Sequence, residues 1–541
     1  MKRIIIVLLL FAGLLRLSAQ PLSSIYENKT LVSFDKYIYN PDSAFHTSVR
    51  PYLLSEFRKN FDYDSARSSY NIKKFSGSPA HYTSRRPSDV IFNTNLFIVR
   101  KDDYGFTIDP LFDFGYGSDF ANDRSTWINT RGFLIEGYLG NDFAFSTQFY
   151  ETQSKVPLWI HNYVGLRGNM PGQGWVKGFG NDAFDYANAA GYVSWSPGRY
   201  FNFRMGHGKQ FLGDGYRSLM LSDHSLYHPY FMATTTFWKI KYVNLFSQFS
   251  HPDVVDHRTS GDVIYAKKYS TMHYLSFIPW KKFNLSLFES ITWQAYDSSY
   301  YRGFELSYLN PVIFYRPVEF NLGSGDNAMI GANLRYTPFK GITVYGQFVA
   351  DEFKIKEFIS GNGWWGNKFA WQAGIKTFGL AGIENLDLQA EYNLIRPYMY
   401  SHYTQVQNYS NAKEPLAHPS GANVKEAVAI ANYNYRRIYF NFKYVWSGSG
   451  LDSSGMNFGK NIFSNPQNVP DEYGNFTGQG LYTTLNQLDF SVSFLVNPAT
   501  NLNLFIGATL REEKNSGIKK EYAWFSFGLR TSLRNLYYDF Y

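Results

Sequence analysis

A run of polar, charged and glycine residues from Gly206 to His224 is the densest concentration of reactive side chains in the sequence. Its candidate ligand-binding residues are His207, Lys209, Asp214, Arg217, Asp223 and His224. Guanidinium and ammonium groups bind carboxylates through charge-assisted hydrogen bonds, while carboxylate and imidazole groups bind hydroxyls. The run therefore predicts a site for a hydroxyl-rich or anionic ligand. The same charges are equally suited to pair with one another and hold a loop in place.

Spacing argues against a nucleotide or metal site in this run. Gly206 and Gly208 lack the third glycine of a dinucleotide-binding loop, and no Ser or Thr follows Lys209 as a P-loop requires. His224 and His228 have the spacing of a helical zinc pair, but no Glu lies between them and no helix is indicated. We therefore predict no metal and no cofactor.

Spacing also argues against a catalytic triad. Ser222, Asp223 and His224 are adjacent in the chain, and neighbouring residues of an extended strand point to opposite faces. No Gly-x-Ser-x-Gly elbow surrounds them. We predict a protein that is not an enzyme, with an outer-membrane hydrolase as the weakest alternative.

A second irregular patch runs from Asn310 to Phe320 and continues to Asn327. It contains two prolines, which argue against a central regular strand. Its candidate residues are Arg316, Glu319 and Asp326, as ligands or as an inward constriction. Alternatively, Arg316 and Glu319 simply pair with each other.

The elements that must position these patches are amphipathic strands. In Asn385–Leu394, and again in Leu502–Arg511, apolar and polar residues alternate, which is the two-residue period of a membrane barrel. The turn Asn497-Pro498-Ala499-Thr500 joins the second of these segments to an alternating segment before it, which predicts a hairpin. The stretch from Ala523 to Leu533 alternates as well, and the chain ends on the aromatic Tyr541, which resembles the C-terminal signal of outer-membrane barrels.

The composition agrees with strands that form the wall of a membrane barrel. The 541 residues include 48 Phe, 44 Tyr and 12 Trp, which excludes a disordered chain, and the absence of Cys excludes a disulfide scaffold. Aromatic side chains form girdles at both water–lipid boundaries of membrane barrels. The formal net charge of +8 comes without any Lys/Arg block, so we predict no nucleic-acid partner.

The N-terminus predicts export. Lys2 and Arg3 precede an apolar run that ends near Leu15, and Ala19 is the expected cleavage site of a signal peptide over residues 1–19. We expect a partly helical plug or periplasmic segment over 20–91, with a helix near Tyr52 to Asn60, and a barrel over 92–541. About 25 residues for each strand and its connection give 16 to 18 strands. Ser447 to Thr484 is predicted to be a long extracellular loop.

At these patches the sequence resembles the Wzi-type capsule-assembly barrels, and especially their Bacteroidota branch, the RemB-like gliding-motility proteins. The stretches that carry the resemblance are Gly208 to Asp223, Asn310 to Phe320 with Asp326-Asn327, Gly459 to Ile462, and Tyr473 to Gly480. The resemblance implies an 18-stranded barrel in the outer membrane of a Gram-negative bacterium, with an N-terminal helical piece.

The resemblance also implies a role in attaching or organising capsular or exopolysaccharide at the cell surface, extending to gliding motility. The expected partners are surface polysaccharide, outer-membrane lipid, and motility or secretion machinery. The alternative from another class is a porin or uptake channel.

Overall fold

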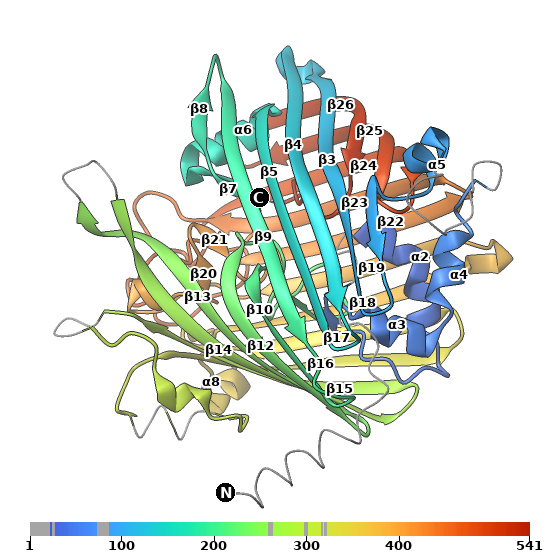
Figure 1. The fold of residues 1–541 in the computed structure, drawn as a ribbon. Coiled ribbons are helices and arrows are strands. Elements are labelled where there is room, and N and C mark those ends of the chain that lie inside the picture. The colour runs from blue at the N-terminus through green and yellow to red at the C-terminus, as the bar shows by residue number, and fades with distance from the viewer. Residues whose placement is uncertain are drawn as a thin grey trace, which may run out of the picture.

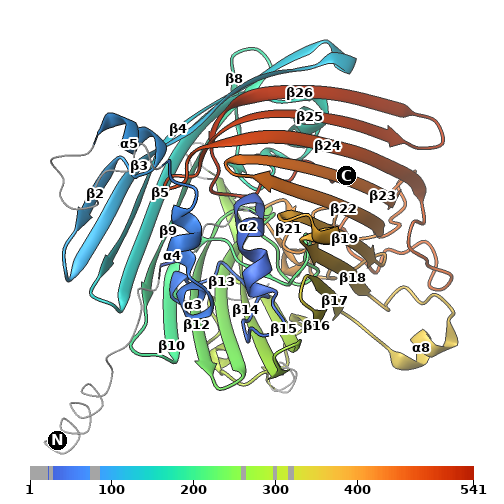
Figure 2. The same ribbon diagram turned by 90° about the vertical axis from the view of Figure 1, so that its right-hand side faces the viewer.

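The computed structural model describes residues 22–23, 28–72, 86–257, 263–296, 301–314, 318 and 322–540. Eighteen antiparallel strands form the wall of one closed barrel (Figures 1 and 2). The wall strands are β3 (Tyr104–Asp119), β4 (Arg124–Leu139), β5 (Phe143–Lys155), β9 (Ala183–Trp195), β10 (Phe201–Gly208), β12 (His228–Phe237), β13 (Ile240–His257), β14 (Val263–Trp280), β15 (Phe283–Gln294), β16 (Asn327–Phe339), β17 (Ile342–Ala350), β18 (Phe369–Phe378), β19 (Leu386–Ile395), β22 (Val424–Tyr435), β23 (Ile438–Leu451), β24 (Leu481–Asn497), β25 (Leu502–Lys514) and β26 (Lys519–Thr531).

The barrel closes between its first and last strands. The ladder between β26 and β3 runs from the pair Trp524–Asp119 to the pair Arg530–Asp113. Below it, the short strand β2 (Phe97–Arg100) takes over the same edge of β3. The predicted all-β transmembrane barrel, with its upper estimate of 18 strands, is confirmed.

Connections alternate between short turns and long loops. Turns such as 140–142, 281–282 and 340–341 lie at one end of the barrel, and the predicted hairpin around Asn497-Pro498-Ala499-Thr500 is observed there between β24 and β25. The loops at the other end include 156–182, 209–227, 295–326, 396–423 and 452–480. In outer-membrane barrels the short turns are periplasmic and the long loops extracellular, which orients this chain.

The alternation predicted from the sequence sets the two faces of the wall. On β25, Leu504, Ile506 and Leu510 are more than half exposed, whereas Asn503 and Arg511 are buried inside. On β26, Phe527 is 48% exposed on the outside. An apolar exterior around a polar interior is the arrangement that a bilayer requires of a barrel.

The N-terminal segment closes the short-turn end. It contains α2 (Asn28–Ile38), α3 (Leu54–Asn60), α4 (Tyr63–Ser68) and α5 (Pro87–Phe92), and Figure 2 shows the first three between the two sides of the barrel. Buried rings of Phe34, Phe57 and Tyr63 hold these helices together. Lys36 donates to Asn385 and Glu56 pairs with Lys241, so the helices are bound to the wall. The predicted helix near Tyr52 to Asn60 is observed as α3.

The end of the chain differs from the expectation of a terminal strand. The last strand stops at Thr531, and residues 532–540 turn back into the lumen. There Asp539 pairs with Arg217 and Lys443, so buried ion pairs bind the tail to the interior of the barrel.

Two further expectations need comment. The loop predicted from Ser447 to Thr484 is shorter, 452–480, because β23 and β24 pair as far as Leu451 with Leu481. The Gly and Ser residues from Ser447 to Gly450, with which the predicted loop began, belong to the end of strand β23. The predicted signal peptide lies outside the described residues. Among the described residues, no helix is both long and apolar enough to cross a membrane.

Candidate functional site

The first predicted patch becomes a loop inside the barrel. β10 ends at Gly208, residues 209–227 enter the lumen, and the chain returns to the wall at His228, where β12 begins. This places Asp214, Arg217, Asp223 and His224 in the buried interior. His207 is exposed on β10, where its ring contacts the carbonyl of Ala189, and it lines one cavity together with Lys209 and Asp223.

Arg217 is the centre of a buried charge network. Its guanidinium donates two hydrogen bonds to Glu426, at 3.0 and 2.9 Å, and a third to Asp539 at 3.1 Å. The Asp539 carboxylate also accepts from Lys443 at 2.5 Å and from the Tyr216 hydroxyl at 2.7 Å. Buried charges are stable only when they are paired and hydrogen-bonded in this way.

The network controls the ionisation of the tail carboxyl. Burial by itself acts to raise the pKa of Asp539, but the charges of Arg217 and Lys443 outweigh it and hold the pKa far below the usual range of an aspartate. Asp539 is therefore ionised whenever the tail is docked at neutral pH.

The other acidic residues of the loop bind it to neighbouring segments. Asp214 accepts hydrogen bonds from Tyr39 at 3.1 Å and from Asn333 at 3.0 Å, and also from Thr47. Asp223 accepts from Asn535 and Tyr537 of the tail, both at 2.7 Å. These two carboxylates thus tie the loop to the N-terminal segment, the wall and the tail.

Lys209 has a similar structural environment. Its ammonium group donates to the carbonyls of Gly172 at 2.6 Å and Asp223 at 2.8 Å. Burial lowers the pKa of Lys209 to about 8, against the opposing charges of Asp223 and Glu414. The interpretation of the patch as a network that holds a loop is therefore realised for Lys209, Asp214, Arg217 and Asp223, and a ligand-binding role for them stays a prediction.

The second patch lies among the extracellular loops. Asp326 is buried and accepts two hydrogen bonds from Arg302, at 2.7 and 2.9 Å, and one from Tyr308 at 2.6 Å. Arg316 and Glu319 lie outside the described residues. Asp326 also accepts from Ser324 and from Gln407 of the 396–423 loop, so its partners belong to the extracellular loops and not to the loop around Arg217.

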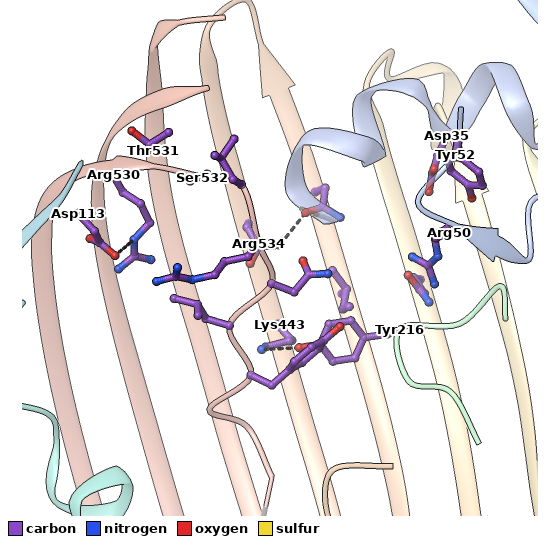
Figure 3. A pocket seen from close by; sticks show the side chains of 18 of the residues that line it. Asp35, Arg50, Tyr52, Asp113, Tyr216, Lys443, Arg530, Thr531, Ser532 and Arg534 are labelled. Atoms are coloured by element: carbon purple, nitrogen blue, oxygen red, sulfur yellow. Dashed lines mark hydrogen bonds and ion pairs between the residues drawn. The ribbon is translucent and has the colours of Figure 1, made fainter. Parts of the chain in front are cut away.

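A cavity of about 180 Å³ lies in the lumen beside the charge network (Figure 3). It is bounded by the N-terminal segment, the inner wall and the tail. The charged side chains that line it are Arg50, Lys376, Lys443, Arg530, Arg534, Asp35 and Asp113. Five cations against two carboxylates make the lining formally positive, which favours an anionic ligand.

Two of these cations are placed by specific contacts. Arg530 donates to Asp113 at 2.8 Å, and the guanidinium of Arg534 stacks over the ring of Tyr150, with 3.8 Å between the guanidinium carbon and the ring centroid. Arg534 also lines a second cavity of about 170 Å³, together with Arg204 and Lys209. Burial acts to raise the pKa of Asp35 on the opposite side, and Lys376 partly offsets this.

The cavity residues were missed in the sequence for two reasons. Lys443 and Arg530 occupy inward positions of alternating strands, so the alternation placed them in the lumen without distinguishing them from other polar residues there. Arg50 and Arg534 come from segments with no recognisable strand pattern. Only closure of the barrel brings the first and last parts of the chain together around one cavity.

The geometry offers no catalytic dyad at the serine considered above. The Ser222 hydroxyl donates to the carbonyl of Ala417 at 2.5 Å, and its contact with His224 is to the backbone N–H of that residue. In the described part of the chain, no three His, Asp or Glu side chains gather as they would around a metal ion. What the lumen presents is polar, cationic and aromatic groups suited to bind hydroxyls and carboxylates.

Comparison with known proteins agrees on the fold. No protein-family model and no curated protein matches the chain. Among solved structures it is similar to Wzi of Escherichia coli, described as an outer-membrane protein involved in group 1 capsule assembly and as a carbohydrate-binding β-barrel. The identity is 14% over 94% of this chain and 99% of that one, with a TM-score of 0.55.

Solved structures from two other organisms are similar to this chain with lower TM-scores. OprD of Pseudomonas aeruginosa is 11% identical over 78% of this chain and 94% of its own, with a TM-score of 0.41. OccAB1 of Acinetobacter baumannii is 11% identical over 79% and 96%, with a TM-score of 0.42. The closed 18-stranded barrel and its apolar outer wall confirm the predicted location in the outer membrane of a Gram-negative bacterium.

Proposed function

We propose that this outer-membrane barrel binds surface polysaccharide and organises it at the cell surface without acting as an enzyme. The observation that carries the proposal is the cationic, aromatic cavity in a lumen that is filled by the N-terminal segment, the 209–227 loop and the C-terminal tail. A barrel filled in this way is better suited to holding a ligand than to passing a stream of solutes. The described likeness in fold to a carbohydrate-binding barrel supports the same proposal.

The chemistry of the site favours an acidic glycan. Arg530 and Arg534 can each donate paired hydrogen bonds to a carboxylate, as found on uronic acid residues, and the ring of Tyr216 also lines the cavity. A contribution to gliding motility, and a place in the RemB-like branch, are the most specific parts of the proposal. They rest on the sequence resemblance alone.

The direct test is glycan binding by the purified protein. Capsular polysaccharide from the native strain is expected to bind the wild-type barrel and to bind Arg534→Ala at least tenfold more weakly. The matched control is Arg58→Ala, a guanidinium in an exposed ion pair with Asp64 outside the cavity, which is expected to leave binding unchanged. Equal binding by all three proteins would contradict the assignment of the cavity.

Two cellular measurements complete the test. Deleting the gene is expected to release polysaccharide into the medium while its synthesis continues, and full retention would count against the proposal. Spreading on a surface, measured in the same strains, tests the motility component separately. The porin alternative is tested in planar bilayers, where a large steady conductance of the wild-type protein would favour a channel.

A further inference from the structure

Three polar side chains form a row on the outer face of the barrel wall. Asn244 on β13 lies opposite His273 on β14, and His273 lies opposite Glu289 on β15. Lys241 and Ser276 face the inside of the barrel, because they contact the N-terminal segment there. Asn244 and His273 are each three positions from one of these residues, so they point to the other face of the wall, and Glu289 shares the face of His273.

This polar row lies at membrane depth. A spanning strand takes about 9–11 residues, so Glu289, six positions along β15 from Phe283 at the short-turn end, lies within the hydrocarbon region. Polar and charged groups that face hydrocarbon destabilise a barrel. The three side chains of the row are nevertheless at most 7% exposed, whereas Leu287 on the same face of β15 is partly exposed. Because the row points away from the lumen, another part of the chain must cover it from outside.

The cover is the 301–314 segment. It belongs to the long connection between β15 and β16, and in Figure 1 it is the yellow-green stretch at the lower left. The backbone N–H of Phe314 donates to Glu289 at 2.6 Å, and the hydroxyl of Tyr242 on β13 donates to the carbonyl of Pro311 at 2.6 Å. The segment therefore descends from the extracellular rim along the outer wall as far as the polar row.

Aromatic rings bind the upper part of the segment to the wall. Trp293 lies four positions beyond Glu289 on the outer face of β15 and is completely buried. Its ring centroid is 5.5 Å from that of Phe304 and 4.9 Å from that of Tyr308. Its indole N–H donates to the carbonyl of Gly303 at 3.1 Å. The segment is thus packed against β15 over its length and is not a free surface loop.

Polar backbone groups of the segment have partners within the protein. Irregular backbone is tolerated at membrane depth only where the protein satisfies its N–H and C=O groups, because lipid cannot. Besides the two contacts with Glu289 and Tyr242, the N–H of Val312 donates to the side chain of Asn310 at 3.2 Å. The N–H of Tyr308 donates to a carbonyl within the segment at 3.1 Å. The polar row therefore serves to satisfy the backbone of the segment that covers it.

The surface that the segment turns away from the wall is apolar. Its large apolar side chains are between 45% and 72% exposed, and they are Leu306, Leu309, Val312 and Phe314. They continue the lipid-facing surface of β16, where Ile330 lies opposite Glu289 and is 52% exposed. The charged residues of the segment, Arg302 and Glu305, pair with each other at 3.6 Å, and Arg302 also binds Asp326 beside the extracellular end of β16.

We infer that the 301–314 segment lies in the outer leaflet of the bilayer, with its apolar surface against acyl chains and the polar row shielded behind it. Lipid is the occupant of this surface, because the surface is continuous with a wall that the bilayer already covers. The inference does not rest on the proposed function, since it concerns the outer face of the barrel and not its lumen. It assigns lipid contact, in place of ligand binding, to the part of the second predicted patch from Asn310 to Phe314.

The test is the depth of a fluorescent probe on the segment. The sequence has no Cys, so Val312→Cys can be labelled at one position with the fluorophore NBD. The protein is reconstituted into vesicles of phosphatidylethanolamine and phosphatidylglycerol. We expect blue-shifted emission that is lost with phospholipid carrying a nitroxide on its acyl chain and is retained with aqueous iodide.

Two labelled controls mark the two environments. Ile506→Cys lies on the lipid-facing side of β25, and Met456→Cys lies in the extracellular 452–480 loop. The probe at Val312 is expected to behave like the first and unlike the second. Quenching by iodide alone would overturn the inference. Protection from both quenchers would show a protein cover, such as a second copy of this chain, and would overturn the assignment of lipid.

The role of the polar row is tested in the same labelled protein. Glu289→Ala removes the acceptor of the Phe314 N–H and is expected to make the probe at Val312 accessible to iodide. The matched control is Ile330→Ala, which lies at the same level of the wall beside the segment and is expected to change nothing. Unchanged quenching in Glu289→Ala would overturn the role of the row. Heat-modifiable migration on gels reports the folded barrel for each variant, and Leu306→Cys is the second labelling position if Val312→Cys does not fold.

Discussion

The tail carboxylate Asp539 provides the sharpest test of the lumen network. Asp539→Asn keeps the shape of the side chain and removes its charge. Arg217 would keep Glu426 at 2.9 Å, and Lys443 would keep Asp489 at 3.3 Å, so neither cation loses every partner. Because of these remaining partners, we take the lower end of the cost of breaking a buried ion pair, about 3 kcal/mol.

That free energy corresponds to an increase of about 100-fold in the fraction of molecules with an undocked tail. The assay is digestion of the detergent-solubilised barrel with carboxypeptidase, which removes residues only from a tail that has left the lumen. Mass spectrometry of the intact chain follows the loss. The wild-type tail is expected to resist digestion, and the Asp539→Asn tail to be trimmed about 100-fold faster.

The matched control is Asp64→Asn on the N-terminal segment. Asp64 also pairs with an arginine, at 2.9 Å, but its side chain is 65% exposed. An exposed pair contributes about 0–1 kcal/mol, so the tail of this variant is expected to be trimmed at the wild-type rate. Equal trimming of Asp539→Asn and the wild-type protein would refute the account of the tail as held by buried charge.

Three further predictions follow from the same contacts. The pKa of Asp539 in the docked tail lies below that of an aspartate in an unfolded chain, about 3.9. The ion pairs of Asp539 therefore stabilise the docked tail fully above that pH, and the stabilisation is lost only as the pH falls below it. Tail trimming is expected to be constant from pH 8 to pH 5, and an increase near pH 6 would contradict this direction of the pKa shift. Deleting residues 532–540 empties part of the lumen, so single-channel conductance is expected to rise above the wild-type level, whereas Arg58→Ala is expected to leave it unchanged. Asp326→Asn removes the carboxylate that Arg302 and the buried Tyr308 share and is expected to make the extracellular loop around Arg302 more sensitive to trypsin, with unchanged migration of the barrel on gels. Equal sensitivity would show that the loop is held by other contacts, such as the pair of Arg302 with Glu305.

Much of the barrel wall could be predicted from the sequence, because the pattern that forms it involves only neighbouring residues. Apolar and polar residues alternate in β19 and β25, and a two-residue period assigns faces from neighbouring positions alone. The turn from Asn497 to Thr500 carries its own signal in Asn and Pro. The strand number of 16 to 18 followed from the chain length and the number of residues that one strand with its connection needs.

The site was predictable only in part. The run from Gly206 to His224 was correctly identified as irregular and polar, and its placement inside the barrel follows from the early end of β10. The partners of Arg217 could not be predicted, since Glu426 and Asp539 are separated from it by more than 200 residues. Arg50 and Arg534 were missed, because no local pattern marks a residue whose role depends on closure.

The sequence by itself determined that this chain forms an outer-membrane barrel, because a bilayer imposes a periodic pattern on every strand that crosses it. The tertiary structure decided what fills that barrel. The C-terminal tail places Asp539 beside the cations Arg217 and Lys443 of distant segments, and the 209–227 loop lies in the lumen because β10 ends at Gly208 and β12 begins only at His228. Both depend on contacts between residues far apart in the chain, which no local pattern records.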